Sequence, residues 1–171
     1  MGKTYDVVAL GELLIDFIWE RADEDGFPVM AAHPGGAPAN FLCALSRYGA
    51  RTALIGKVGR DAFGDMLIAK LERSGVDAAG VQKTEEAFTT LAFVTLDEKG
   101  DRSFSFARKP GADTTLRREE VPRELIDGTK AFHFGTLSLT HEPARSATMA
   151  AVSYARGQGK LVTFDPNLRR P

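Results

Sequence analysis

The sequence predicts an α/β fold with a mostly parallel β-sheet, and three observations support that fold class. Short apolar runs such as Val7–Leu10 end at glycine or polar residues, which is typical of buried strands. Amphipathic stretches with helix signals at both ends follow them, as between Pro38 and Gly49. The two kinds of segment alternate along much of the chain of 171 residues. Such alternation is typical of helices that cover a parallel sheet.

The first elements can be justified in order from their local signals. Pro38 suits the first turn of a helix, because a proline has no N–H to leave unpaired there. Asp61 is a good N-cap, and Gly49 and Gly75 are suitable residues for the ends of helices. In chain order we expect a strand at Val7–Leu10, an extended segment at Leu13–Trp19, a helix from Pro38 to about Gly49, a strand at Thr52–Gly56, and a helix from Asp61 to Gly75.

A predicted β-hairpin interrupts this alternation. Thr89–Leu96 is rich in β-branched and aromatic residues, Asp97–Asp101 forms a turn, and Arg102–Arg108 alternates polar and apolar residues. A hairpin inserted in an α/β chain indicates a flap or a small subdomain. The alternation then resumes with a strand at Ala131–Phe134, a helix from Pro143 to Tyr154 closed by Gly157, and a strand at Lys160–Asp165.

The bulk composition excludes several classes of function. A formal net charge of −1 gives no electrostatic basis for binding nucleic acid or an anionic membrane. No apolar run approaches the roughly 20 residues that span a bilayer. Cys43 is the single cysteine, so no disulfide framework is expected. The three histidines lack metal-ligand spacing. We expect a cytoplasmic protein with no resident metal among these side chains.

The segment Gly35-Gly36-Ala37-Pro38-Ala39-Asn40 is the strongest functional signal. Two glycines let the backbone turn sharply and approach a ligand closely, and Asn40 offers an amide near the start of a helix. A tight turn without function is the simpler interpretation. A phosphate loop is excluded because no Gly-Lys-Ser/Thr follows, and Gly-x-Gly-x-x-Gly does not occur in the chain.

Three other positions have both a functional and a structural interpretation. Asp16 lies in an apolar strand, where it can bind two sugar hydroxyls or face water from an edge strand. Arg108 ends the hairpin, either solvated or pointing its donors into a site. Phe106 shares a face with Phe104, and packing accounts for both, more readily for Phe104.

Asn167 and Arg169 follow the last predicted strand, at the end where open α/β sheets place ligands. The two side chains can contact a phosphoryl group. A capping turn at Asp165-Pro166 is the alternative, although it leaves Arg169 without a role.

Taken together, these residues resemble the ribokinase-like (PfkB-type) carbohydrate kinases. The resemblance runs through Gly11–Asp16, Gly35–Asn40 and Leu54–Asp65, and through Arg108–Asp113 and Phe164–Arg169, which look like the fructokinase branch. It implies a three-layer sandwich with a mostly parallel sheet and a β-sheet lid built from segments at about 12–34 and 87–110. It also implies ATP, Mg²⁺ and, nearby, a monovalent cation such as K⁺.

The resemblance also implies a role for each matching residue. Asp16, Gly35, Gly36 and Asn40 would hold sugar hydroxyls, and Phe106 and Arg108 would close over the sugar from the lid. Asn167 and Arg169 would lie towards the phosphates. Ala107 departs from the bulkier aromatic residue often found in the family.

The resemblance covers only the N-terminal part of such a kinase, since family members are nearly twice as long. Their catalytic base and nucleotide-binding part would lie beyond Pro171. The expected function is therefore the sugar-binding half of a kinase for fructose or a related sugar, with a possible homodimer through the lid. The alternatives are a kinase for 2-keto-3-deoxygluconate or another sugar acid, and a sugar-binding domain without catalysis.

Overall fold

The computed structural model describes residues 4–96 and 102–167. Its main sheet has five strands in the order β5-β4-β1-β8-β9, and all of the pairings are parallel. In that order the strands are Val76–Thr84, Thr52–Gly59, Tyr5–Leu10, Thr129–Gly135 and Leu161–Asp165. β4 is buried at every position, as expected for a parallel strand covered on both faces. The predicted α/β class with a mostly parallel sheet is confirmed.

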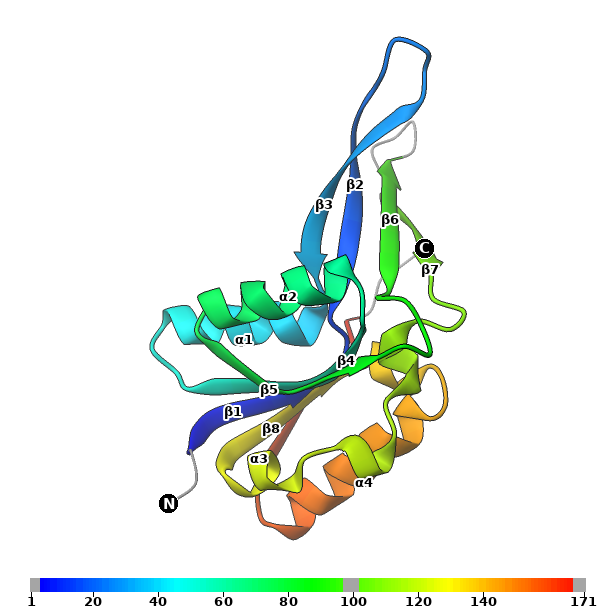
Figure 1. Ribbon diagram of the computed structural model, residues 1–171. Helices are drawn as coiled ribbons and strands as arrows, with labels where there is room; N and C mark the ends of the chain where they lie inside the picture. The colour runs from blue at the N-terminus through cyan, green and yellow to red at the C-terminus, as the bar shows by residue number, and fades with distance from the viewer. Residues whose placement is uncertain (1–3, 97–101, 168–171) are drawn as a thin grey trace.

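Helices cover both faces of the main sheet (Figure 1). On one face lie α1 (Ala37–Arg47) and α2 (Ala62–Arg73), and on the other lie α3 (Arg123–Asp127) and α4 (Ala144–Gly157). Within the described residues, short 3₁₀ turns also occur in the connections: η1 (Ala112–Thr115), η2 (Arg118–Glu120) and η3 (Leu137–Leu139). None of the helices in the described residues is long and apolar enough to cross a membrane.

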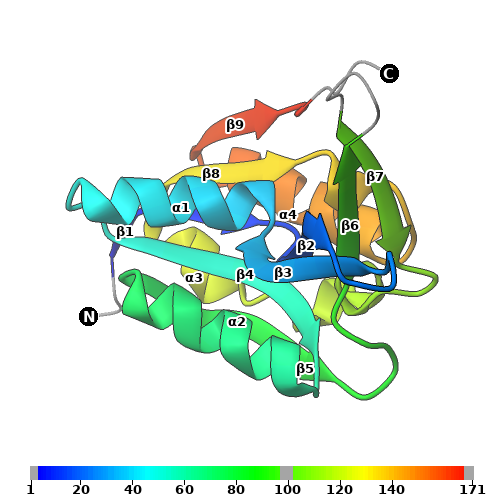
Figure 2. The same cartoon turned by 90° about the horizontal axis from the view of Figure 1, so that it is seen from above.

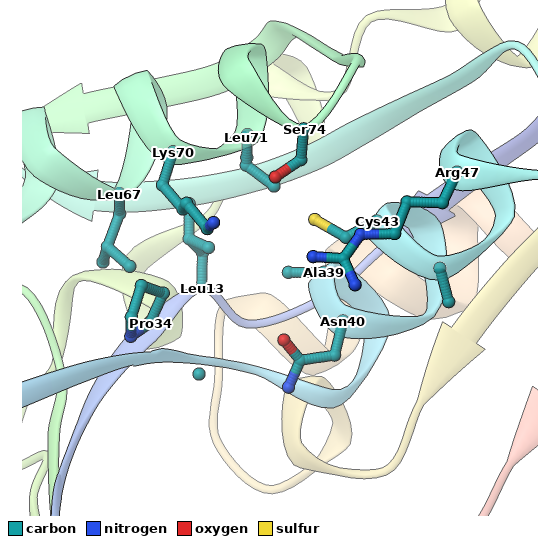
Figure 3. A pocket seen from close by; sticks show the side chains of 12 residues that line it. Leu13, Pro34, Ala39, Asn40, Cys43, Arg47, Leu67, Lys70, Leu71 and Ser74 are labelled. Atoms are coloured by element: carbon teal, nitrogen blue, oxygen red, sulfur yellow. The ribbon is translucent and has the colours of Figure 1, made fainter.

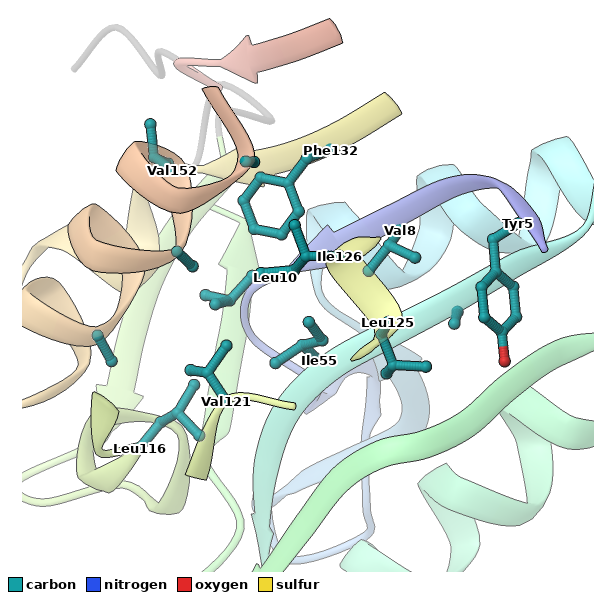
Figure 4. Packing of buried hydrophobic residues seen from close by; sticks show 14 of the residues in the cluster. Tyr5, Val8, Leu10, Ile55, Leu116, Val121, Leu125, Ile126, Phe132 and Val152 are labelled. Carbon is teal, nitrogen blue, oxygen red and sulfur yellow. The ribbon is translucent and has the colours of Figure 1, made fainter. Parts of the chain in front are cut away.

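Two apolar cores hold the three layers together. Phe132 is fully buried between β8 and the α3/α4 layer, where Leu10, Ile126 and Val152 surround it (Figure 4). The second core lies on the opposite face and includes Leu42 of α1. Burying each such side chain contributes about 1.5–3 kcal/mol relative to leaving it exposed.

A second, small sheet has the order β3-β2-β6-β7. We call it the small sheet. Its strands are β3 (Pro28–Gly35), β2 (Leu14–Ala22), β6 (Leu91–Leu96) and β7 (Arg102–Ala107). β2 pairs antiparallel with β3 and parallel with β6, and β6 and β7 form the predicted hairpin. The turn expected at Asp97–Asp101 lies outside the described residues. Figures 1 and 2 show this sheet at the end of the main sheet where β1 and β8 terminate.

Several predicted boundaries shift in the structure, and two strands were missed. β3 contains Pro28 and Pro34, and β5 contains Gly80, so neither segment carries a simple strand pattern. Helix α4 runs past the predicted Tyr154 and ends at Gly157, the residue expected to close it, and Gly159, whose φ is 69°, makes the turn that follows.

The start of α2 agrees with the prediction. The Asp61 carboxylate accepts hydrogen bonds from the Gly64 N–H at 2.9 Å and from the Thr89 N–H at 2.8 Å. One side chain therefore caps the helix and also holds the segment that leads into β6.

Replacing this cap should cost stability. We expect Asp61→Ala to lower the free energy of unfolding by about 2 kcal/mol, because helix and loop donors both lose their acceptor. Asp65→Ala, which removes an exposed ion pair with Lys83, should cost about 0.5 kcal/mol. Urea unfolding of both variants checks this, and equal losses would show that the cap has no special weight.

Candidate functional site

A cavity of about 600 Å³ lies between the main sheet and the small sheet. We call it the inter-sheet cavity. It lies at the carboxyl ends of the central strands, where open α/β sheets place their ligands. Its lining comes from five parts of the chain: Glu12, Leu14 and Asp16; Gly36, Ala37 and Asn40; Phe104 and Phe106; Gly135, Thr136 and Leu137; and Pro166 and Asn167. Five of the eight predicted site residues are therefore brought together here.

The Gly35-Gly36 pair lies against other parts of the chain, whereas the sequence predicted a close approach to a ligand. Gly36 has a φ of 110°, and an added methyl group would overlap the Glu12 carbonyl oxygen. At Gly35 a methyl group would overlap the Asp16 carboxylate. Gly35 does not itself line the inter-sheet cavity, but it lets Asp16 and the start of α1 lie side by side. Only glycine fits both positions.

Asp16 lies on β2, opposite His33 of β3 and Ala92 of β6. β2 is therefore an inner strand of the small sheet, and the alternative of an edge-strand charge facing water is wrong. The half-buried Asp16 side chain lines the inter-sheet cavity instead. Asn40, in the first turn of α1, presents its amide to the same space.

Phe104 and Phe106 bring aromatic surface to the cavity from β7. Their rings stack with centroids 6.4 Å apart, and the residues are 38% and 44% exposed. Aromatic faces of this kind offer apolar surface to a ligand that also carries polar groups. The two rings therefore pack against each other and also line the cavity.

Arg108 does not reach the inter-sheet cavity. The residue is 5% exposed, and its Nε and Nη2 donate to Asp113 at 2.9 and 2.6 Å. Nη2 also donates to the Leu137 carbonyl at 2.9 Å, and Nη1 donates to Thr140 at 2.8 Å. The structure therefore differs from both predictions, because Arg108 is neither exposed to solvent nor directed into the cavity. The guanidinium is buried because it makes a bidentate contact with the Asp113 carboxylate. Its further hydrogen bond to the Leu137 carbonyl holds a residue that lines the cavity.

Asn167 lines the cavity, while Arg169 lies outside the described residues. The Asn167 N–H donates to Asp165 Oδ1 at 2.8 Å, so the capping turn at Asp165-Pro166 is present as well. Thr136 Oγ1 donates to the Pro166 carbonyl at 2.7 Å and joins this segment to the end of β8.

Glu12 is the residue of this site that the sequence reasoning missed. It lies two residues after the end of β1, beyond Gly11, and is 4% exposed. Its Oε1 accepts a hydrogen bond from the Ala37 N–H at 3.0 Å, which satisfies one donor at the start of α1. Burial raises the pKa of its carboxyl to about 7. The available signal was a charged residue at the end of a buried apolar strand.

A second, smaller pocket of about 210 Å³ lies between α1 and α2. Gly35 and Asn40, which belong to the turn before α1 and to its first helical turn, also line this second pocket. Cys43 lines it from α1 (Figure 3). Lys70 and Arg47 extend into the gap between the two helices (Figure 3). Within the described residues neither side chain has an ion-pair partner.

Breaking the Arg108–Asp113 pair should destabilise the protein strongly. We expect Arg108→Met to lower the free energy of unfolding by about 3–5 kcal/mol, because the buried Asp113 carboxylate loses its counter-charge. Arg118→Met, at an exposed arginine, should change it by about 0.5 kcal/mol or less. Denaturant unfolding compares the two, and a loss below about 1 kcal/mol for Arg108→Met would contradict the assigned role.

Gly35 can be tested in the same way. Gly35→Ala should cost about 1–3 kcal/mol, since the new methyl group overlaps the Asp16 carboxylate and the strand or helix must shift. Gly157→Ala is the matched control, because an added Cβ there meets nothing within 4 Å. That variant should be neutral or slightly stabilising. Thermal unfolding distinguishes the outcomes, and a neutral Gly35→Ala would show that the close approach is not required.

The chain matches the pfkB family carbohydrate kinase over residues 4–171. It is 44% identical to the probable fructokinase-5 of Arabidopsis thaliana over 176 residues, which cover 100% of this chain and 53% of the relative. The crystal structure of the fructokinase from Xylella fastidiosa superposes with a TM-score of 0.90 at 35% identity, covering 96% of this chain and 51% of that one.

A putative ribokinase II from E. coli, solved in complex with ATP and Mg²⁺, has a TM-score of 0.86 at 32% identity and covers 96% of this chain and 54% of that one. The chain thus spans about half the length of the relatives it matches. From the family match over almost all of its residues we conclude that the chain belongs to the pfkB family of carbohydrate kinases.

Proposed function

We propose that this chain is the sugar-binding half of an ATP-dependent sugar kinase that transfers the γ-phosphate of ATP to a hydroxyl of fructose or a related sugar. The observation that carries the proposal is the inter-sheet cavity, where Asp16, the Gly36 turn and Asn40 meet at the carboxyl ends of the central strands. The similarity to fructokinases over the whole chain supports the same class of substrate.

The lining of the cavity suits a hydroxylated ring. The Asp16 carboxylate accepts hydrogen bonds from neighbouring hydroxyls, and the Asn40 amide both donates and accepts. Phe104 and Phe106 supply an apolar face against which the C–H groups of a sugar can pack. Such a mixture of a few polar groups with aromatic surface is typical of sites for small ligands.

We propose that ATP and Mg²⁺ bind mainly to the part of the kinase that this chain does not span. The described residues hold no group of three or more His, Cys, Asp or Glu side chains that could bind a metal ion. Asn167 lines the cavity just after the end of β9, and we assign it to the phosphate-binding side of the site. We assign Arg169 to the same side from the sequence. We place the catalytic base and the adenine pocket in the part of the relatives that this chain does not span.

A neutral sugar suits the cavity better than a sugar acid. A kinase for 2-keto-3-deoxygluconate needs a cation for the substrate carboxylate, and Arg108 and Arg169 are the two candidates for that role. The Arg108 guanidinium is already bound to Asp113, outside the cavity lining. Arg169 is the remaining candidate for such a contact.

A homodimer through the small sheet is a further part of the proposal. Ile18 and Trp19 of β2 are each 41% exposed. Large apolar side chains on an exposed sheet favour association, so β2 offers a surface that a second copy of this chain can cover.

The direct test of activity is a coupled assay of ADP release by the continuous gene product over a panel of sugars. Turnover with fructose supports the proposal, and turnover with 2-keto-3-deoxygluconate alone would favour the sugar-acid alternative. Calorimetric binding of fructose without any turnover would favour a sugar-binding domain without catalysis. No turnover and no binding across the panel would overturn the proposal.

Asp16 gives the sharpest test of the binding site. Asp16→Asn should raise the Kd for fructose about tenfold or more, because charge-assisted hydrogen bonds to sugar hydroxyls are replaced by weaker ones. Asp25→Asn, at an exposed residue outside the cavity, is the matched control and should leave the Kd unchanged. Isothermal titration calorimetry measures both, and an unchanged Kd for Asp16→Asn would rule out the assigned contact.

A further inference from the structure

One carboxylate oxygen in the inter-sheet cavity has no partner. Glu12 Oε1 accepts the Ala37 N–H, but Oε2 is buried and makes no hydrogen bond with any described residue. Buried polar atoms are nearly always hydrogen-bonded, because an unpaired one loses its water without compensation. Among the described residues, Oε2 is the one buried side-chain nitrogen or oxygen atom without a hydrogen-bond partner.

The position of Glu12 explains what this oxygen can bind. The residue lines the same cavity as Asp16, Gly36 and Asn40. Gly36 approaches the Glu12 backbone so closely that no side chain fits between them. The carboxylate is therefore fixed beside the proposed sugar hydroxyls, with one oxygen used by α1 and the other left for a ligand.

We infer that Glu12 is a sugar-positioning residue, whose Oε2 accepts a hydrogen bond from a hydroxyl of the bound sugar while Oε1 holds the start of α1. This inference rests on the proposed function, because it assigns a further contact to the same cavity. It deepens that function by making Glu12 a second carboxylate acceptor beside Asp16. A bound hydroxyl supplies the donor that Oε2 otherwise lacks.

The charged surroundings of Glu12 determine how this contact depends on pH. Asp16 of β2 lines the same cavity, and Asp113 of η1 and Arg108 after β7 act on Glu12 through the protein. Burial raises the pKa of the Glu12 carboxyl to about 7, hydrogen bonds from backbone N–H groups lower it, Asp113 raises it and Arg108 lowers it. Without sugar, a proton therefore occupies Glu12 in a substantial fraction of molecules near neutral pH.

A sugar hydroxyl that donates to Oε2 favours the ionised form of Glu12. Sugar binding should therefore lower the pKa of this carboxyl and release a proton. By linkage, affinity should be highest above pH 7 and should fall as the pH drops below it. If the protonated carboxyl donated to the sugar instead, the affinity for sugar would be highest below pH 7 and would fall as the pH rises.

The first experiment measures the Kd for fructose by calorimetry at pH values on both sides of 7. Glu12→Gln keeps an oxygen for the Ala37 N–H but removes the ionisable acceptor. Above pH 7 we expect its Kd to be about tenfold higher than that of the wild type. Below pH 7 the affinity of the wild type should fall, whereas the affinity of Glu12→Gln should stay constant. Glu72→Gln, at an exposed glutamate of α2, should keep both the affinity and the pH profile of the wild type.

The second experiment needs no variant. The ¹³Cδ resonance of Glu12, assigned through bonds to its backbone, is titrated with and without saturating fructose. Direct contact should move its midpoint about one pH unit lower, which corresponds to a tenfold preference of the sugar for the ionised form. A role limited to holding α1 would leave this midpoint unchanged.

The outcomes distinguish the proposed Glu12 contact from the proposed sugar-binding function. Failure of the wild-type protein to bind any sugar overturns both. Binding with an unchanged Glu12 midpoint, or with an affinity that rises as the pH falls, overturns the inference and leaves the sugar site intact. An equal Kd for Glu12→Gln and the wild type at every pH also overturns the inference.

Discussion

The parallel pairing of β1 with β4 on one side and β8 on the other is the constraint on which the remaining structure depends. Val8 lies opposite Ala53 and Phe132. Because Leu10 pairs with Phe134, β1 and β8 end within one residue of each other, while β4 continues past Ile55, the partner of Leu10, to Gly59. The shared end of β1 and β8 places Glu12, the Gly36 turn and Thr136 around one space. The small sheet leaves from the same end, and the inter-sheet cavity follows from that geometry.

A second contribution comes from buried charge. The Arg108–Asp113 ion pair joins the end of β7 to η1 and, through the Leu137 carbonyl, to η3. Thr90 Oγ1 donates to the same Asp113 carboxylate. A pair of opposite charges removed from water is tolerated only when its geometry and hydrogen bonds compensate the loss of hydration, so the network fixes one arrangement of the cavity wall.

Much of the fold could be predicted from the sequence, because its signals are local. The hydrogen bond from the Gly64 N–H to Asp61 at the start of α2 and the apolar run of β1 both arise from residues close together in the sequence. β3 and β5 were missed, since their prolines and glycine are accepted only in the context of the complete sheets.

The site shows the same division between local and tertiary information. The Gly35-Gly36 turn and Asn40 are adjacent in sequence, and they were predicted as one unit. The partner of Arg108 could not be predicted, because whether an arginine binds a ligand or a nearby carboxylate is decided by tertiary packing. Glu12 was missed for a related reason: the sequence shows a charge after a strand, but not that one of its two oxygens is already used.

The parallel pairing of β2 with β6 has a kinetic consequence. It joins Ile15 to Leu91, and β3, α1, β4, α2 and β5 all lie between them in the chain. Closing so long a loop costs entropy that only later contacts repay. We therefore expect β2 and β6 to pair after the intervening strands and helices have folded, so that the ligand cavity becomes enclosed late, on a scaffold that is already formed.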